Sequence, residues 1–255
     1  MAYATESGIM NVMNKSTVDE IRRRFDGDVE RFSNLDTGQV STVDAPLSLE
    51  LITEAAKRVN PGARTLLDVG CGAGNYTVKM LDKIPDLDCV LLDLSLNMLN
   101  RACERVKPLT AGAVNVMQSD IRTAPLGENR FDIILAGAVL HHLRDDVDWK
   151  RAFAKLYISL KPGGCLMISD LVAQDTPVLT EYIWEHYKNY LNETGGPEYC
   201  SKVLDYIEKE DSPRSVTCQM ELMRTVGFTG VDILHKHICF AAFCGIKPSN
   251  ACPQV

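Results

Sequence analysis

The sequence predicts an α/β fold built on a doubly wound, mostly parallel sheet of seven strands that ends in an antiparallel hairpin. Between residues 65 and 172, short apolar runs alternate with amphipathic segments of helical length. The apolar runs are continuous, which indicates strands buried on both faces, as in a parallel sheet covered by helices. The last two runs, 230–237 and 238–247, follow each other with almost no link, so they must pair antiparallel.

Two helices are expected before the first strand. The first begins at Ser16, where Asp19 would complete a pair that resembles a capping box. The second follows Asp44, carries Pro46 in its first turn, and ends before the Asn-Pro-Gly stop at 60–62. The N-terminal helix is expected to form a lid over the sheet.

From residue 65 onward, strands and helices alternate. The expected strands are 65–70, 89–94, 113–120, 131–139 and 164–172, and the expected helices are 75–84, 95–106 and 149–160. Residues 173–226 contain helical segments only, which makes them a helical cap inserted before the final hairpin. The chain is therefore expected to be one domain, 1–255, made of a lid (16–44), a core (45–172), a cap (173–226) and a hairpin (227–247).

Composition and charge exclude several classes of protein. The 255 residues carry a formal net charge of -7, whereas a broad nucleic-acid surface needs a basic face. The apolar runs have strand length, so no membrane span is expected, and the N-terminus lacks the pattern of a secretory signal. We therefore expect a cytoplasmic location, in which the nine cysteines are reduced and mostly buried.

No metal site is expected from the sequence. The cysteines form no CxxC pair. His235 and His237 lie two residues apart on one expected strand, and hence on one face, but a metal would need more ligands than these two.

A glycine-rich turn joins the first strand to its helix. Residues 68–74, Asp-Val-Gly-Cys-Gly-Ala-Gly, place glycines where backbone N–H groups can approach a ligand at the positive end of a helix. The spacing is GxGxG, and Asn75 stands where a dinucleotide-binding loop would have its third small residue. Asp68 would repel a pyrophosphate but attract the ammonium of an amino-acid-bearing cofactor. The alternative is a tight turn that holds no ligand.

Two acidic residues follow the next two strands. Asp93 lies 23 residues after Gly70, where a carboxylate can accept hydrogen bonds from both hydroxyls of a ribose. Alternatively, it caps the helix that begins near Ser95. Asp120 could accept a hydrogen bond from an adenine amino group, or close a turn at the strand end. The side chains that could sandwich the base are Leu94, Met98 and Ile121.

Five segments carry a resemblance to a known family: LLDVGCGAGNYT, VLLDLSLNML, QSDI, FDIILAGAVLHHL and LKPGGCLMISD. In this order and spacing they resemble the class I (Rossmann-like) S-adenosylmethionine (AdoMet)-dependent methyltransferases. The resemblance covers about 45–172 and the final hairpin, and it implies AdoMet as cofactor and S-adenosylhomocysteine (AdoHcy) as product. The contacts it implies are Asp68 at the amino group, Gly70, Cys71 and Gly72 at the methionine end, Asp93 at the ribose, Asp120 and Ile121 at the adenine, and Ala136 and Gly137 near the sulfonium.

The N-terminal segment is similar to the lid helix of the same superfamily. Phe25-Asp26 followed by Phe32 carries this similarity, which would bring Phe32 to the cofactor. A lid helix combined with a helical insertion before the final hairpin is similar to the layout of one subgroup. That subgroup includes small-molecule methyltransferases and the carboxy-AdoMet synthases.

Two histidines follow the fourth strand, where an acceptor would approach the cofactor. His141 or His142 could act as a general base, which methyl transfer needs only when the nucleophile carries a proton. The alternative is that one packs and the other binds backbone. In the insertion, Tyr182 and Trp184 could line the acceptor pocket or form a local core. Arg214 could pair with an anionic acceptor or lie on the surface.

Three functions are compatible with these residues. The first is methyl transfer to a small-molecule acceptor, as the resemblance implies. The second is modification of the cofactor itself by an enzyme similar to carboxy-AdoMet synthase, for which Arg214 is the candidate cation. The third is a non-catalytic AdoMet- or AdoHcy-binding protein, for which a homodimer is one expected form.

Overall fold

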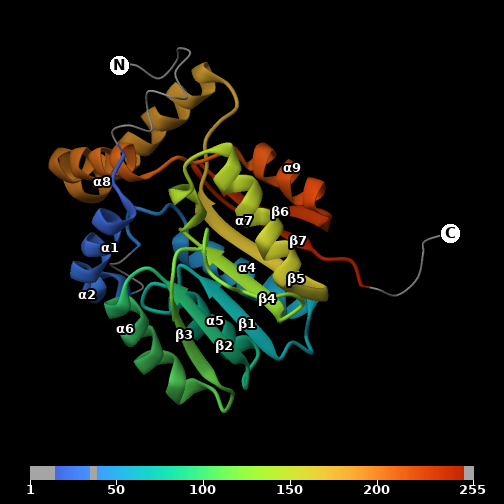
Figure 1. The fold of residues 1–255 in the computed structure, drawn as a ribbon. Coiled ribbons are helices and arrows are strands. Elements are labelled where there is room, and N and C mark those ends of the chain that lie inside the picture. The colour runs from blue at the N-terminus through green and yellow to red at the C-terminus, as the bar shows by residue number, and fades with distance from the viewer. Residues whose placement is uncertain (1–14, 35–38, 250–255) are drawn as a thin grey trace.

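A seven-stranded sheet forms the centre of the molecule (Figure 1). The computed structural model describes residues 15–34 and 39–249. The strands lie in the order β3-β2-β1-β4-β5-β7-β6. Neighbours among β1 to β5 pair in parallel, and β7 pairs antiparallel with β5 and β6, which confirms the predicted fold class. The strand bounds are β1 Thr65–Val69, β2 Asp88–Asp93, β3 Val114–Gln118, β4 Phe131–Gly137, β5 Leu160–Leu171, β6 Thr229–His237 and β7 Phe240–Ile246.

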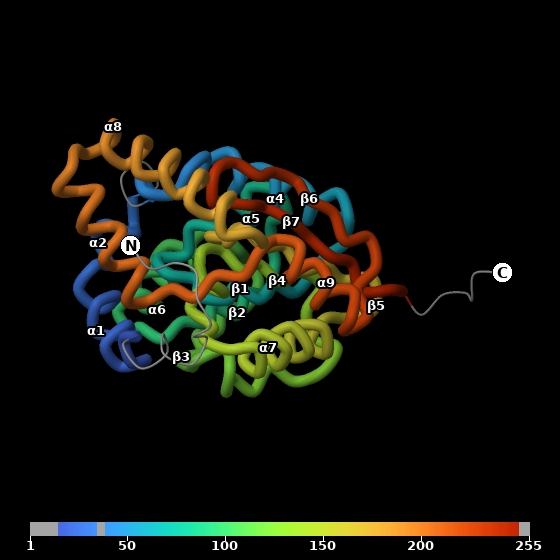
Figure 2. Tube along the Cα trace, turned by 90° about the horizontal axis from the view of Figure 1, so that it is seen from above, coloured from blue at the N-terminus to red at the C-terminus, as the bar shows by residue number. Residues whose placement is uncertain are grey.

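Helices cover both faces of the sheet (Figure 2). Successive residues of a buried strand point to opposite faces. Leu66 packs into the core under α4, α5 and α6, whereas its neighbour Leu67 packs into the core under α7 and α9. The helix bounds are α1 Val18–Gly27, α2 Val29–Ser33, α4 Ala45–Val59, α5 Asn75–Lys83, α6 Leu96–Val106, α7 Asp146–Ser159, α8 Pro177–Glu210 and α9 Val216–Val226, with short 3₁₀ turns η2 Lys107–Leu109 and η3 Leu140–His142.

The first helix begins one residue later than predicted. Thr17, not Ser16, is the N-cap of α1, and its hydroxyl oxygen accepts from the N–H of Glu20 at 3.3 Å. The Glu20 carboxylate in turn accepts from the N–H of Thr17 at 2.7 Å. The capping box is therefore Thr17–Glu20 and not Ser16–Asp19. Both pairs have the three-residue spacing, but a glutamate is one methylene longer than an aspartate and reaches back to the N-cap N–H.

The helical insertion is dominated by α8, which changes direction at Gly196. This glycine has φ 81°, a left-handed conformation that interrupts the helix next to Pro197. Around the bend, buried Tyr187 and Leu191 pack with Phe240 at the start of β7. In Figures 1 and 2, α8 extends beside the lid helices α1 and α2, at one end of the sheet.

No helix within 15–34 and 39–249 combines the length and the apolar character that a membrane crossing requires.

Candidate functional site

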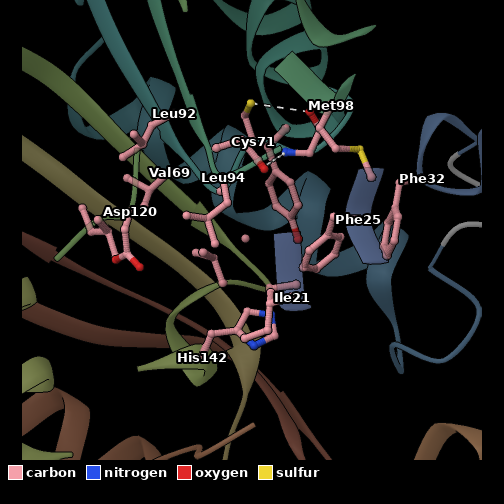
Figure 3. Close-up of a pocket in the computed structure, with 18 of the residues that line it drawn as sticks. Ile21, Phe25, Phe32, Val69, Cys71, Leu92, Leu94, Met98, Asp120 and His142 are labelled. Carbon is pink, nitrogen blue, oxygen red and sulfur yellow. Dashed lines mark hydrogen bonds between the residues drawn. The ribbon is translucent and has the colours of Figure 1, made fainter. Parts of the chain in front are cut away.

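A pocket lies where the carboxyl ends of the central strands meet the lid helices (Figure 3). The chain proceeds from β1 to β2 on one side and continues with β4 on the other, so this is the point at which the strand order reverses. Open α/β sheets bind ligands at this place. In Figure 3, Phe25 and Phe32 of the lid lie on one side of the pocket and Val69 and Asp120 lie on the other.

The glycine loop after β1 forms one wall of the pocket. Gly70 has φ 64°, and a Cβ at this position would lie 2.4 Å from a methyl of Val139 in the loop after β4. Gly72 has φ 50°, and a Cβ there would project into open space. The first glycine is therefore required by packing, and the second keeps a concave wall free for a ligand.

Asp68, at the end of β1, is buried beneath this loop. Its Oδ2 accepts from the hydroxyl of Thr77 at 2.6 Å and from the N–H of Thr77 at 3.2 Å. Its Oδ1 is buried and has no hydrogen-bond partner among the described residues. Burial raises the pKa of the carboxyl to about 7, although the Thr77 hydrogen bonds oppose this. An unpaired carboxylate oxygen here fits the ammonium group of a bound amino acid.

Asp93, at the end of β2, holds the glycine loop in place. One carboxylate oxygen accepts from the N–H of Gly72 and the other from the N–H of Ser95, both at 2.9 Å. Ser95 itself caps α6, since its hydroxyl accepts from the N–H of Met98. Asp93 lines the pocket, and each of its oxygens retains a lone pair that could accept from a ribose hydroxyl.

Asp120, after β3, is paired with an arginine that the sequence analysis did not identify. Arg122 donates to its two oxygens at 2.9 and 2.5 Å, and to Asp148 at 3.2 Å. The N–H of Arg122 also bonds Asp120 at 2.8 Å, which is the strand-end turn considered above. Burial alone would raise the pKa of Asp120, but Arg122 lowers it. Both side chains line the pocket.

Apolar side chains complete the cofactor half of the pocket. Leu94, Met98 and Ile121 line it next to Asp93 and Asp120. At the end of β4 only Gly137 lines the pocket, whereas Ala136 lies inside the core. A Cβ on Gly137 would lie 2.4 Å from the ring of Tyr76, another lining residue. Phe32 also lines the pocket, and its ring is 5.6 Å from that of Phe25.

The lid is fastened to the C-terminal end of α8. Arg24 of α1 donates to both oxygens of the Glu210 carboxylate, at 2.9 and 2.8 Å, and to the hydroxyl of Tyr206 at 2.6 Å. On its other side, the side-chain amide of Asn75 donates to the carbonyl of Phe32 at 3.0 Å. These bonds hold Ile21, Phe25 and Phe32 against the pocket.

The two histidines after β4 have different surroundings. His141 is buried, with Nδ1 in a short contact to Asp170 Oδ1 and Nε2 at 3.7 Å from Asp211. Burial lowers the pKa of His141, but the two aspartates outweigh it and raise the pKa to about 9. His142 lines the pocket (Figure 3). Its Nδ1 lies 3.2 Å from Asp211 Oδ1, and its buried Nε2 has no partner among the described residues.

The chain is similar to known methyltransferases. Residues 66–164 match the family model described as a methyltransferase domain. Phosphoethanolamine N-methyltransferase 1 of Arabidopsis thaliana is 37% identical over 124 residues, which cover 48% of this chain but only 24% of that enzyme. Demethylmenaquinone methyltransferase of Lactococcus lactis is 27% identical over 177 residues, 68% of each chain. Residues 66–164 of this chain therefore form a methyltransferase domain, and the chain is similar to these methyltransferases.

A solved structure shares the fold of this methyltransferase. Human N-acetylserotonin methyltransferase in complex with SAM (AdoMet) superposes with a TM-score of 0.60 at 17% identity, covering 95% of this chain and 66% of that one. A methyltransferase domain implies AdoMet as the cofactor. The residues present fit it, because Gly72 leaves open space in the wall and Asp93 lines the pocket with lone pairs that a ribose hydroxyl could use. Asp68 does not line the pocket but lies buried behind the glycine loop, and its Oδ1 has no hydrogen-bond partner among the described residues.

Three residues that the sequence suggested for the acceptor lie elsewhere in the methyltransferase. Tyr182 is 55% exposed on α8, and its ring packs against His186. Trp184 packs beside Tyr187 in the core of the insertion. Arg214 donates to Asp146 at 2.6 Å on the surface. None of the three lines the pocket. The first part of α8 packs Trp184 into the core beside β7 and leaves Tyr182 exposed, and Arg214 lies between α8 and α9.

Proposed function

We propose that this methyltransferase acts on a small, largely apolar acceptor and that His142 removes the proton from its nucleophilic atom. The observation that carries the proposal is the buried Nε2 of His142 in the wall of the pocket, which has no hydrogen-bond partner within 15–34 and 39–249. A buried nitrogen without a partner is costly, and an acceptor O–H or N–H would satisfy it.

The neighbours of His142 favour a base over a structural role. Asp211 and the carbonyl of Glu210 lie 3.2 and 3.4 Å from Nδ1, which favours a proton on Nδ1 and leaves the Nε2 lone pair free. Asp211 is buried and would stabilise the imidazolium formed when Nε2 takes a proton. His141 is unsuited to this task, since its raised pKa keeps it protonated at neutral pH.

The wall beside His142 indicates the character of the acceptor. It is formed by the apolar side chains Val18, Ile21, Phe25, Val139 and Leu143. Among the described lining residues the only lysine or arginine is Arg122, which is engaged by Asp120 and Asp148. A ring-bearing apolar acceptor, as in the name demethylmenaquinone methyltransferase, therefore suits this wall better than a phosphorylated one such as phosphoethanolamine.

Bound AdoMet supplies a methyl group on an electrophilic sulfonium. The chain's own contribution is to align the acceptor, exclude water and accept the proton. The lid residues Ile21 and Phe25 cover the pocket and exclude water, and His142 accepts the proton at Nε2. A carboxy-AdoMet synthase-like reaction is less well supported, because its candidate cation, Arg214, is paired with Asp146 outside the pocket.

AdoHcy formation on a panel of phenols, quinols and amines tests the proposal, with His142→Gln beside wild type and His186→Gln as the matched surface control. We expect His142→Gln to lower the maximal rate by about 100-fold or more while AdoHcy affinity is unchanged. The loss should shrink at high pH, where the acceptor ionises unaided. If His142→Gln leaves the maximal rate unchanged, or weakens AdoHcy binding as much as it lowers the rate, His142 is not the base. Absence of AdoHcy formation on every acceptor would favour a non-catalytic binding protein.

A further inference from the structure

Three metal-ligating side chains meet on the edge of the sheet, outside the cofactor pocket. His235 and His237 lie on the edge strand β6, and Asp44 is the residue before α4. His235 Nε2 is 2.9 Å and His237 Nδ1 is 2.8 Å from the same oxygen, Asp44 Oδ2. The three ligand atoms lie within 4.8 Å of one another. Asp44 thus adds the third ligand that the sequence alone did not provide.

The side chain of Asp44 contacts the two histidines and does not cap its own helix. An aspartate at an N-cap ordinarily accepts from the N–H groups of the first turn. Asp44 makes no such side-chain bond, and its backbone has φ 55°, a left-handed conformation that is unusual outside glycine. The carboxylate therefore leaves the helix end uncapped while one of its oxygens accepts from two imidazoles.

The chemistry of this group fits a divalent transition metal. Two imidazole nitrogens and one carboxylate oxygen are a common protein ligand set for zinc, with a further position left for water. Ligand atoms around tetrahedral zinc are about 3.3 Å apart, since each lies about 2.0–2.2 Å from the metal. The two distances to Asp44 Oδ2, 2.8 and 2.9 Å, would need a small outward movement, and the two histidine nitrogens lie within 4.8 Å of each other. His237 is half exposed, which leaves a path from solvent.

The position of the group differs from that of the methyl-transfer site. None of the three residues lines the cofactor pocket. Two tyrosines of α8 bind the backbone just before Asp44. The hydroxyl of Tyr187 donates to the carbonyl of Ser41, and the hydroxyl of Tyr190 donates to the carbonyl of Val40. A metal at Asp44 would join this stretch, which connects the lid to α4, to the edge of the sheet.

We propose that Asp44, His235 and His237 form a binding site for a divalent transition metal of the zinc class. The test uses the full chain without a polyhistidine tag, stripped with a chelator and titrated with Co²⁺, whose visible absorption reports nitrogen and oxygen ligation. We expect one Co²⁺ per chain, displaced by Zn²⁺, and at least a 100-fold weaker affinity in His235→Ala and in Asp44→Asn.

Two control variants separate this site from the other candidate ligands. His141, His142 and Asp211 also lie within metal-ligand distance of one another, so His142→Ala is compared, together with the surface variant His186→Ala. Both controls should bind Co²⁺ as wild type does. Binding that is lost in His142→Ala and kept in His235→Ala would overturn the proposal. So would the absence of Co²⁺ binding at millimolar concentration, which would make the group a hydrogen-bonded cluster only.

Discussion

The carboxylate of Asp93 accepts a hydrogen bond from the N–H of Gly72 at 2.9 Å, so the end of β2 braces the glycine loop that follows β1. The same carboxylate faces the cofactor pocket. Its loss should therefore affect the cofactor site twice, by removing an acceptor and by releasing the loop.

We expect Asp93→Ala to weaken AdoHcy binding by about 1–3 kcal/mol while the protein stays folded, since charged hydrogen bonds are worth about this much. Asp93→Asn should lose less, because its amide oxygen can still accept from Gly72. Titration calorimetry and a thermal unfolding curve measure the two effects. Wild-type affinity in Asp93→Ala would mean that the residue only shapes the turn before α6.

We expect cofactor binding to depend on pH through the buried carboxyl of Asp68. Its pKa is raised to about 7, so below pH 7 it is mostly protonated and cannot pair with an ammonium. AdoHcy affinity should rise as the pH increases from 5.5 to 7, by up to about tenfold per unit, and level off above it. Asp68→Asn should bind weakly with no such slope, whereas the exposed control Asp82→Asn should follow wild type. A flat profile in wild type would contradict this assignment.

The His141–Asp170 pair should stabilise the fold in a defined pH range. The folded pKa of His141 is about 9, above its ordinary value of 6.5. Its contribution is therefore complete below pH 6.5 and is lost as the pH rises through 9. Asp170→Asn should cost about 3–5 kcal/mol of unfolding free energy at pH 6 and less at pH 9.5. Urea unfolding at both values measures this, and an equal cost at the two would argue against a charged pair.

The ion pair between Arg24 and Glu210 should hold the lid helix α1 in its position over the pocket. Their side chains are only 26% and 7% exposed, so the pair is weakly screened. Arg24→Gln and Glu210→Gln should each weaken AdoHcy binding several-fold, because the lid residues Ile21 and Phe25 line the pocket. The double variant should be no weaker than the single ones, with a coupling of about 0.5–3 kcal/mol. Additive losses in the cycle would mean that the two residues act independently.

More of the fold than of the candidate site could be predicted from the sequence. Continuous apolar runs such as 89–92 are short and alternate with segments of helical length, which favours strands buried on both faces, and the glycine spacing after β1 restricts the loop strongly. Asp68, Asp93 and Asp120 follow strand ends, so chain order alone brings them to one edge of the sheet.

The remaining features depend on contacts between distant parts of the chain. The pairing of His142 with Asp211 requires the end of α8 to return to the loop after β4. Helical spacing in 181–191 shows which aromatic residues share a face, but not whether that face meets the pocket or β7. Asp44 and His235 are 191 residues apart, so no local pattern could join them.

The central claim is that the pocket after β1 binds AdoMet as methyl donor and not a dinucleotide. Calorimetric titration of the full chain with AdoHcy and, separately, with NAD tests this claim most directly. We predict one AdoHcy per chain with micromolar affinity, weakened in Asp93→Ala and Asp68→Asn, and no measurable heat from NAD. Tighter binding of NAD than of AdoHcy, or AdoHcy binding that neither variant affects, would contradict it.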